Sequence, residues 1–421
     1  AEQGDLTLKA SVDFEGEDGD PHRKGGWMIR ESLEPDSAYA DVMVHGNGLI
    51  SLQFRRTAGG PTEEISAPQK APAVVRLERT DDVFSLFVSE DGKNFQPAAG
   101  VRLDLSDRVL VGLALCSHRA DRTEKAIFSK VSMKALNLNS DDERILESSL
   151  ETIEVATGGR NVVYQAQDHF EAPNWSRDGS SLIFNQQGKL YSILLGENAP
   201  KLIDTDFADR CNNDHGFSPD GDLLAISHSP EGKSLIYVLP AEGGVPRLVT
   251  RSGPSYWHGW SPDGKTLAYC AERNGEYDIY TIPAVGGSET RLTDAPGLDD
   301  GPDYSPDGKF IYINSERTGL MKIWRISPDG KTQEQVTFDT DYADWFPHPS
   351  PDGRWLVFVS YDKSVEGHPP NKEVVLRVMA MDGGQPKVLT RFFGGQGTIN
   401  VPSWSPDSKR FAFVSYRLVA P

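Results

Sequence analysis

The second half of the chain repeats one short motif six times. Each copy reads Ser-Pro-Asp-Gly or a close variant of it, and the copies begin at Ser176, Ser218, Ser261, Ser305, Ser350 and Ser405. Successive serines are 42, 43, 44, 45 and 55 residues apart. A period of this size that carries only strand-like segments and turns is typical of a β-propeller, in which each repeat builds one four-stranded blade.

Each repeat follows the same plan. An apolar or aromatic residue precedes the serine, the Pro-Asp-Gly forms a turn, and an apolar strand and an alternating strand follow, as in residues 267–270 and 278–282. The last repeat stops after residues 411–415, whereas residues 151–164 supply the missing strand, Gly-Gly turn and strand. We therefore predict six blades, the sixth built from both ends of the repeat region, so that no edge strand stays open.

The region before the repeats predicts a different all-β domain. Gly, Asp and Pro turns separate strand-like segments at residues 6–13, 26–30, 41–45, 49–55, 74–79, 83–88, 109–116 and 126–133. No long helical period is present, so we expect an antiparallel two-sheet sandwich. The predicted domains are a sandwich at 1–136, a polar linker at 137–149 and a six-bladed propeller at 150–421.

Two resemblances follow from these motifs. The segments Gly25-Gly-Trp-Met-Ile-Arg-Glu-Ser-Leu and Val75-Arg-Leu-Glu-Arg resemble the concanavalin-like, laminin-G-like jelly rolls of secreted carbohydrate-active proteins. The Ser-Pro-Asp-Gly repeats resemble the TolB-type propellers. That family includes a periplasmic scaffold protein, peptidase propellers and oligogalacturonate lyases, so the resemblance implies a periplasmic or secreted location and leaves the function open.

Composition and motif absences narrow the function classes. The chain has 43 Lys and Arg against 62 Asp and Glu, a net charge of −19, which disfavours nucleic acids and anionic membranes as partners. Three scattered cysteines are too few for a disulfide framework or a cysteine-based zinc site. No stretch is apolar enough for membrane insertion. No nucleophile elbow, His-Glu-x-x-His helix or phosphate-binding Gly loop occurs, so we expect no nucleotide cofactor.

The candidate site lies on the face opposite the Ser-Pro-Asp-Gly turns, where side chains depart from the repeat. His215 and His258 stand three residues before the serine in adjacent repeats, where other repeats have proline. Their imidazoles can bind a divalent metal such as Ca, Mn or Zn, or act as an acid and base pair. His348 is a third candidate metal ligand, but its one-residue offset turns the side chain to the other face. Alternatively, the histidines hydrogen-bond backbone between blades.

The oligogalacturonate lyases resemble this arrangement, because they hold a metal with histidines at the channel mouth of a TolB-like propeller. The resemblance implies a metal-binding role for His215 and His258 alone. The predicted six blades depart from the seven blades of those enzymes, which weakens the transfer.

Two Glu-Arg pairs, Glu272 with Arg273 and Glu316 with Arg317, end the second strands of adjacent repeats. Each pair offers an acid or base and a guanidinium that can hold hydroxyls or a carboxylate. A salt bridge between blades explains the same residues equally well.

The remaining candidates are polar or aromatic residues on the approach to the inner strands. Tyr256 and Asp300 are candidate proton-transfer groups, and Asn213 and Asn400 are candidate substrate contacts. Trp257 and Trp345 can stack on sugar rings or, alternatively, fill space between blades. Residues 362–373 and 392–398, inside the longest repeat, are expected to wall or cover the cleft.

These features favour a carbohydrate-active protein that binds a saccharide on the polar face. If it is catalytic, His215 and His258 with a metal would acidify a substrate proton that Tyr256, Glu272 or Asp300 moves. Arg273 and Arg317 would then hold the anion. A lyase is favoured over hydrolysis by two carboxylates, because the sequence does not pair two acids across the channel. The alternative is a non-catalytic scaffold that docks a protein partner or a glycan.

Overall fold

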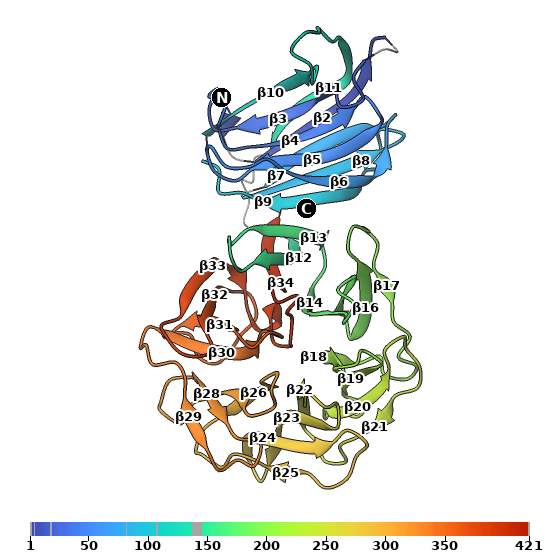
Figure 1. Cartoon of the computed structure of the whole chain (residues 1–421). Helices are drawn as coiled ribbons and strands as arrows, with labels where there is room; N and C mark the ends of the chain where they lie inside the picture. The colour runs from blue at the N-terminus through green and yellow to red at the C-terminus, as the bar shows by residue number, and fades with distance from the viewer. Residues whose placement is uncertain are drawn as a thin grey trace.

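The chain folds into a two-sheet unit at one end and a ring of small sheets at the other (Figure 1). The computed structural model describes residues 2–3, 5–16, 19–80, 82–106, 108–136 and 145–419. The elements of secondary structure in these residues are strands, apart from one 3-10 turn, η2 (Gln396–Thr398). Within the described part of the chain, no helix is long and apolar enough to cross a membrane.

The N-terminal unit consists of two antiparallel sheets that enclose one hydrophobic core. The first sheet has six strands in the order β1 (Glu2–Gln3), β10 (Arg108–Cys116), β3 (Lys24–Arg30), β4 (Tyr39–His45), β5 (Leu49–Arg55) and β6 (Glu63–Lys70). The second begins with β11 (Ala126–Leu136), β2 (Asp5–Phe14), β7 (Val74–Thr80), β8 (Val83–Ser89) and β9 (Gln96–Arg102).

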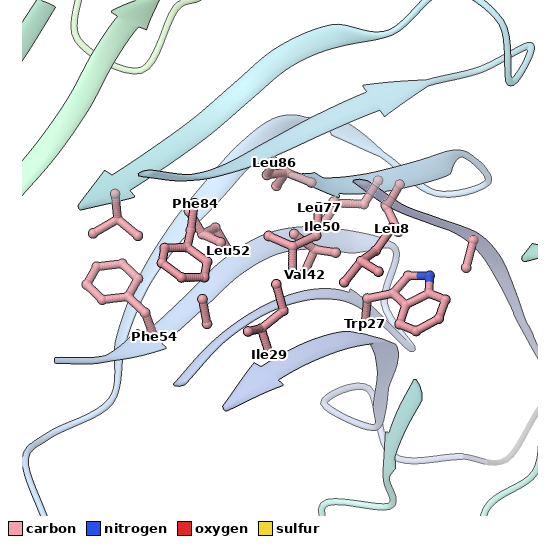
Figure 2. Close-up of a cluster of buried hydrophobic side chains, with 14 of the residues drawn as sticks. Leu8, Trp27, Ile29, Val42, Ile50, Leu52, Phe54, Leu77, Phe84 and Leu86 are labelled. Carbon is pink, nitrogen blue, oxygen red and sulfur yellow. The ribbon is translucent and has the colours of Figure 1, made fainter. Parts of the chain in front are cut away.

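Alternation of apolar residues along these strands explains the core. In β2 every second side chain, from Leu6 to Val12, is buried, as a half-buried strand requires. Figure 2 shows the cluster between the two layers, with Leu8, Leu77 and Leu86 from one sheet meeting Ile29, Val42 and Phe54 from the other. All eight strands predicted in this region are present, and β1, β6 and β9 were not predicted.

The repeat region forms five four-stranded antiparallel sheets, each with its strands in sequence order. They are β14 (Phe170–Trp175), β15 (Ser181–Gln186), β16 (Lys189–Leu194) and β17 (Lys201–Leu202); β18 (Cys211–Phe217), β19 (Leu223–His228), β20 (Leu235–Pro240) and β21 (Arg247–Leu248); β22 (Ser255–Trp260), β23 (Thr266–Arg273), β24 (Glu276–Pro283) and β25 (Thr290–Arg291); β26 (Asp299–Tyr304), β27 (Ile311–Ser315), β28 (Lys322–Ile326) and β29 (Gln333–Gln335); and β30 (Tyr342–Pro349), β31 (Trp355–Asp362), β32 (Lys372–Ala380) and β33 (Lys387–Gly394).

The two ends of the repeat region share one sheet, as the sequence predicts. Strand β12 (Ile145–Glu154) pairs with β34 (Arg410–Val419) along its whole length, and β13 (Arg160–Ala166) lies on the other side of β12. Residues 145–149 of the predicted linker therefore belong to a strand, because their partners in β34 complete its hydrogen bonds. The rest of that linker, residues 137–144, lies outside the described residues.

This shared sheet continues into the N-terminal unit, which the sequence did not predict. Asn161 and Val162 of β13 pair with Val101 and Gly100 of β9, so both units contribute to one eight-stranded sheet. A Cβ atom at Gly100 would come within 2.9 Å of the Val162 side chain, so the glycine allows this close approach.

Candidate functional site

The Ser-Pro-Asp-Gly turns are built alike and position the inner strands. In each of the six copies, the serine hydroxyl donates to the aspartate two residues later, as Ser261 does to Asp263 at 2.7 Å. The aspartate in turn accepts a backbone N–H within the turn, from residue 265 in that copy. These bonds hold the turn in one shape. The inner strand before it therefore enters each sheet in the same orientation.

Five inner strands also contain a bulge, whereas the sixth copy has only an isolated bridge, from Trp404 to Phe411. The pairing register shifts in the middle of β14, β18, β22, β26 and β30. A bulge bends a strand and re-aims its side chains. As a result, residues five positions before the serine occupy equivalent places at the channel mouth; they are Glu171, Asn213, Tyr256, Asp300, Trp345 and Asn400.

Five of these six residues, all except Trp345, line one pocket of about 570 Å³. This volume is in the range of small-molecule sites. The other lining residues are His169, Asn212, Asp214, His258, Cys270, Tyr277, Leu298, Phe346, His368, Pro370 and Gln396. His368 with Pro370, and Gln396, come from the two loops that were expected to wall the cleft. None of the described lining residues is a lysine or an arginine.

The centre of the pocket holds a buried ion pair between His258 and Asp300. The Nε2 atom of His258 lies 3.2 Å from Oδ1 of Asp300, and its Nδ1 atom lies 3.1 Å from the carbonyl oxygen of Asn400. Burial by itself would lower the pKa of His258, but the hydrogen bond and charge of Asp300, with the charge of Asp214, raise it to about 9. The pKa of Asp300 is lowered in spite of burial, because it faces the imidazolium. The pair is therefore charged at neutral pH.

Two further carboxyl groups in the pocket, Glu171 and Asp214, have raised pKa values, although the charge of His258 lowers that of Asp214 in part. Burial raises the pKa of Glu171 to about 7, and the only side chain that donates to it is Asn213, at 3.4 Å, among the described residues. The carboxyl group lies against Gly397 of η2, where a methyl group would overlap it. Burial also raises the pKa of Asp214 to about 6, although Asn212 and Asn400 both donate to it. These two acids can exchange a proton near neutral pH.

The three predicted metal-ligand histidines do not come together. His258 lines the pocket, but both of its ring nitrogens already have partners. His215 is fully buried outside the pocket lining, near the backbone of Ala172, and burial lowers its pKa to about 3. His348 contacts Asp303 through Nδ1 at 3.1 Å and the Ile399 carbonyl through Nε2 at 2.6 Å. Among the described residues, no group of three His, Cys, Asp or Glu side chains has the arrangement of a metal site.

The Glu-Arg pairs do not reach the pocket either. Arg273 forms an ion pair with Glu289 at 2.8 Å, and Arg317 forms one with Asp299 at 2.8 Å. Glu289 directly precedes β25, the last strand of the sheet that contains Arg273. Asp299 lies in β26, the first strand of the sheet whose second strand, β27, ends just before Arg317. These bridges are thus within one blade, whereas the alternative from sequence placed them between blades. Neither Glu272 nor Glu316 is among the described residues that line the pocket.

The two candidate tryptophans have structural positions. Trp257 lines a smaller cavity of about 230 Å³, together with Trp175, Trp260 and Trp404 and with prolines of the Ser-Pro-Asp-Gly turns. Trp345 is 1% exposed, and its ring lies 4.4 Å from the ring of His368, so it supports a pocket residue from behind. Both tryptophans therefore fill space between blades and do not stack on a ligand.

The packing of Trp257 predicts a large effect of a small substitution. Its ring lies against Gly216 of the neighbouring inner strand, and a methyl group there would overlap the ring. Gly216→Ala should lower the free energy of unfolding by about 1–3 kcal/mol, because a packed interior resists added atoms. Denaturant unfolding measures this. Gly112→Ala, where nothing lies within 4 Å of the added carbon, is the control and should stay within about 0.5 kcal/mol. Equal stabilities of the two variants would contradict the packing.

Several pocket residues were missed from sequence. Glu171, His169, Tyr277, Cys270 and Phe346 line the pocket, but they were not among the candidates. A count of five residues back from each serine would have found Glu171, since it identifies the other residues at that position. Nothing in the repeat identifies Tyr277, which comes from β24, the third strand of its sheet, and lies with its ring centre 6.5 Å from that of Tyr256.

Comparison with known proteins identifies relatives of the repeat region. The family model described as the TolB beta propeller domain matches residues 254–374. An uncharacterized protein of Agrobacterium fabrum is 54% identical over 273 residues, which cover 64% of this chain and 93% of that protein. A solved structure with a provisional TolB name, from Agrobacterium tumefaciens, is 54% identical, covers 65% of this chain and 99% of its own, and has a TM-score of 0.63.

More distant solved structures share less. TolB from Acinetobacter baumannii is 18% identical, with a TM-score of 0.45 and coverage of 68% of this chain and 80% of its own. An oligogalacturonate lyase in complex with manganese is 15% identical, with a TM-score of 0.42 and coverage of 65% and 84%. At these values neither similarity carries an argument about the activity of this chain.

Proposed function

The chain belongs to the TolB β-propeller family, and from this premise we propose that it binds a saccharide in the channel-mouth pocket. The observation that carries the proposal is the composition of the pocket wall. Rings of Tyr256, Tyr277 and Phe346 stand beside amide and carboxyl groups such as Asn213 and Glu171. Aromatic faces pack on the apolar C–H surface of a sugar, while amides and carboxyls bond its hydroxyls.

The same pocket supports proton transfer to or from the bound saccharide. Glu171 has a pKa of about 7 because it is buried, so both its protonation states are populated at neutral pH. Tyr256 stays protonated at neutral pH and is not a general base, since burial and nearby Tyr277 raise its pKa to about 12. We therefore propose Glu171 as the proton-transfer group, in place of Tyr256, Glu272 or the metal-assisted route. That route has no support in the contacts of His258 and His348.

Binding by the full chain tests this proposal. Calorimetric titration with saccharides selected on a glycan array should give an affinity that falls at least about tenfold in Tyr256→Ala, because a stacking ring is lost. Glu334→Gln, a change at an exposed acid outside the pocket, is the control and should bind like the natural protein. Release of reducing ends in the same samples separates an enzyme from a binding module. Absence of saccharide binding, or binding unchanged in Tyr256→Ala, would remove the proposal.

We propose two further assignments at the level of architecture. The set β13, β12 and β34, with Trp404 bridged to Phe411, serves as the sixth blade, which is supported by its strand order. The N-terminal unit is a concanavalin-like jelly roll, supported by its two facing sheets.

A periplasmic or secreted location remains part of this proposal, and cell fractionation tests it. A glycan array on the full chain with and without pocket substitutions tells whether the jelly roll binds sugar separately.

A further inference from the structure

We propose that the ligand of the channel-mouth pocket carries a protonated amino group, which sits between Glu171, Asp214 and Asn400. This inference rests on the proposed saccharide-binding function and narrows its ligand to amino sugars. Three independent features of the pocket support it: an excess of hydrogen-bond acceptors, the lack of a free cation, and aromatic rings around the acceptors.

The pocket offers acceptors that the protein itself does not satisfy. Glu171 receives a single long bond of 3.4 Å, from Nδ2 of Asn213. Asn400 is 1% exposed and uses its Nδ2 atom on the carbonyl of Asn213 and on Asp214, at 3.2 and 3.0 Å. Its Oδ1 atom is buried with no hydrogen-bond partner among the described residues. A buried acceptor without a donor is costly, so a ligand that brings donors is favoured.

The cations in the pocket cannot serve these acceptors. His258 is bound to Asp300 and to the Asn400 carbonyl. Burial lowers the pKa values of His169 and His368, which leaves both rings neutral at pH 7. With no lysine or arginine among the described lining residues, Glu171 and Asp214 give the pocket a net negative charge. The net charge of the chain, −19, acts in the same direction.

An ammonium group fits this environment better than a metal ion or an acidic sugar. An ammonium has three donors, which match three acceptors at ordinary hydrogen-bond distances. A metal ion instead requires ligands that converge on one point, and no group of three His, Cys, Asp or Glu side chains does so among the described residues. A uronate would meet two carboxyl groups and no guanidinium, since Arg273 and Arg317 bond elsewhere. The rings of Tyr256, Tyr277 and Phe346 also favour a cation nearby.

The experiment compares sugars that differ only in the relevant group. The full chain is titrated at pH 7 with the glucosamine disaccharide, its N-acetylated form, cellobiose and digalacturonate. We expect the free amine to bind at least about tenfold tighter than the N-acetylated and neutral sugars, because it adds one charge-assisted hydrogen bond. Digalacturonate should bind most weakly. Glu171→Gln, and separately Asp214→Asn, should reduce the advantage of the amine to below about threefold, whereas Glu334→Gln, a change at an exposed acid of β29, should keep it.

The outcomes separate this inference from the proposed function. Equal binding of the amine and N-acetylated sugars, with Tyr256→Ala still harmful, would overturn the inference and leave saccharide binding intact. If no saccharide binds but cyclohexylamine raises the melting temperature more than cyclohexanol, in a manner lost in Glu171→Gln, the amine site stands and the saccharide proposal falls. Stabilisation by Mn²⁺ alone that depends on Glu171 and displaces the amine would overturn the inference in favour of a metal.

Discussion

Replacing Glu151 with glutamine is expected to lower the free energy of unfolding by about 3–5 kcal/mol, the cost of removing one partner from a buried ion pair. Glu151 is fully buried in β12. It receives Arg102 of β9 at 2.9 Å and Arg160 of β13 at 2.7 Å, and the hydroxyl of Ser415 in β34 also donates to it. Burial would raise the pKa of Glu151, but the two guanidiniums lower it. Glutamine would leave Arg160 without a carboxylate partner among the described residues, and Arg102 with Asp82 alone.

The location of Glu151 adds a second expectation. Its partners lie in the N-terminal unit and in strands from both ends of the repeat region. We therefore expect hydrogen exchange in β12, β13 and β34 to rise more than exchange in β22 to β25. Because the folded pKa of Glu151 is depressed, its contribution is present above the ordinary glutamate pKa and is lost as pH falls through the folded value.

Urea unfolding monitored by hydrogen exchange measures both effects. Glu334→Gln is the matched control, since the Arg325–Glu334 pair is exposed at 35% and 46% and should contribute at most about 1 kcal/mol. A loss at Glu151 no greater than at Glu334 would show that the network does not hold the two units together.

Asp300→Asn is expected to lower the pKa of His258 from about 9 to below its ordinary 6.5, because burial then acts without the neighbouring anion. The stability cost at pH 7 should be about 1.5–3 kcal/mol, as for hydrogen bonds to charged groups. Asp214 keeps a weaker attraction for the ring, and the lowered pKa of His368 leaves that neighbour neutral. Titration of the histidine ring signals by NMR measures the change directly.

The pH dependence of stability checks the same pair. The folded pKa of His258 is raised, so its stabilisation is complete below about 6.5 and is lost as pH rises through about 9. The natural protein and Glu272→Gln should lose stability over this interval, and Asp300→Asn should not show that loss. A His258 signal that titrates near 6.5 in the natural protein would refute the ion pair.

The strands that sequence predicted and those it missed differ in composition. Residues 49–55, Leu-Ile-Ser-Leu-Gln-Phe-Arg, alternate well and form β5 as predicted. Strand β9 begins Gln-Pro-Ala-Ala-Gly, without a large apolar residue, and β6 contains Pro68 among exposed residues. Strand β9 forms because it pairs with β8, and β6 forms because it pairs with β5. Such pairing depends on residues distant in the chain, so the local sequence does not indicate it.

The site shows the same division. Asn213, Tyr256, His258, Asp300 and Asn400 were predicted and do line one pocket. His215 stands at the same place in its repeat as His258, but its strand contains a longer register shift, so its side chain lies elsewhere. Residues 212–214 are unpaired at the shift in β18, whereas only residue 258 is unpaired at the shift in β22, and a bulge re-aims the side chains of its strand.

By itself the sequence determined the all-β class, the repeat and the sharing of one sheet by both ends of the repeat region. Turn chemistry and strand alternation are local, so they can be read along the chain. Only the tertiary structure decided that Glu171, Asp214 and Asn400 line one pocket, that the arginines of the Glu-Arg pairs are neutralised within their blades, and that β13 joins the N-terminal sheet. Those contacts join segments far apart in the chain. Their charge states depend on burial, which the folded molecule alone defines.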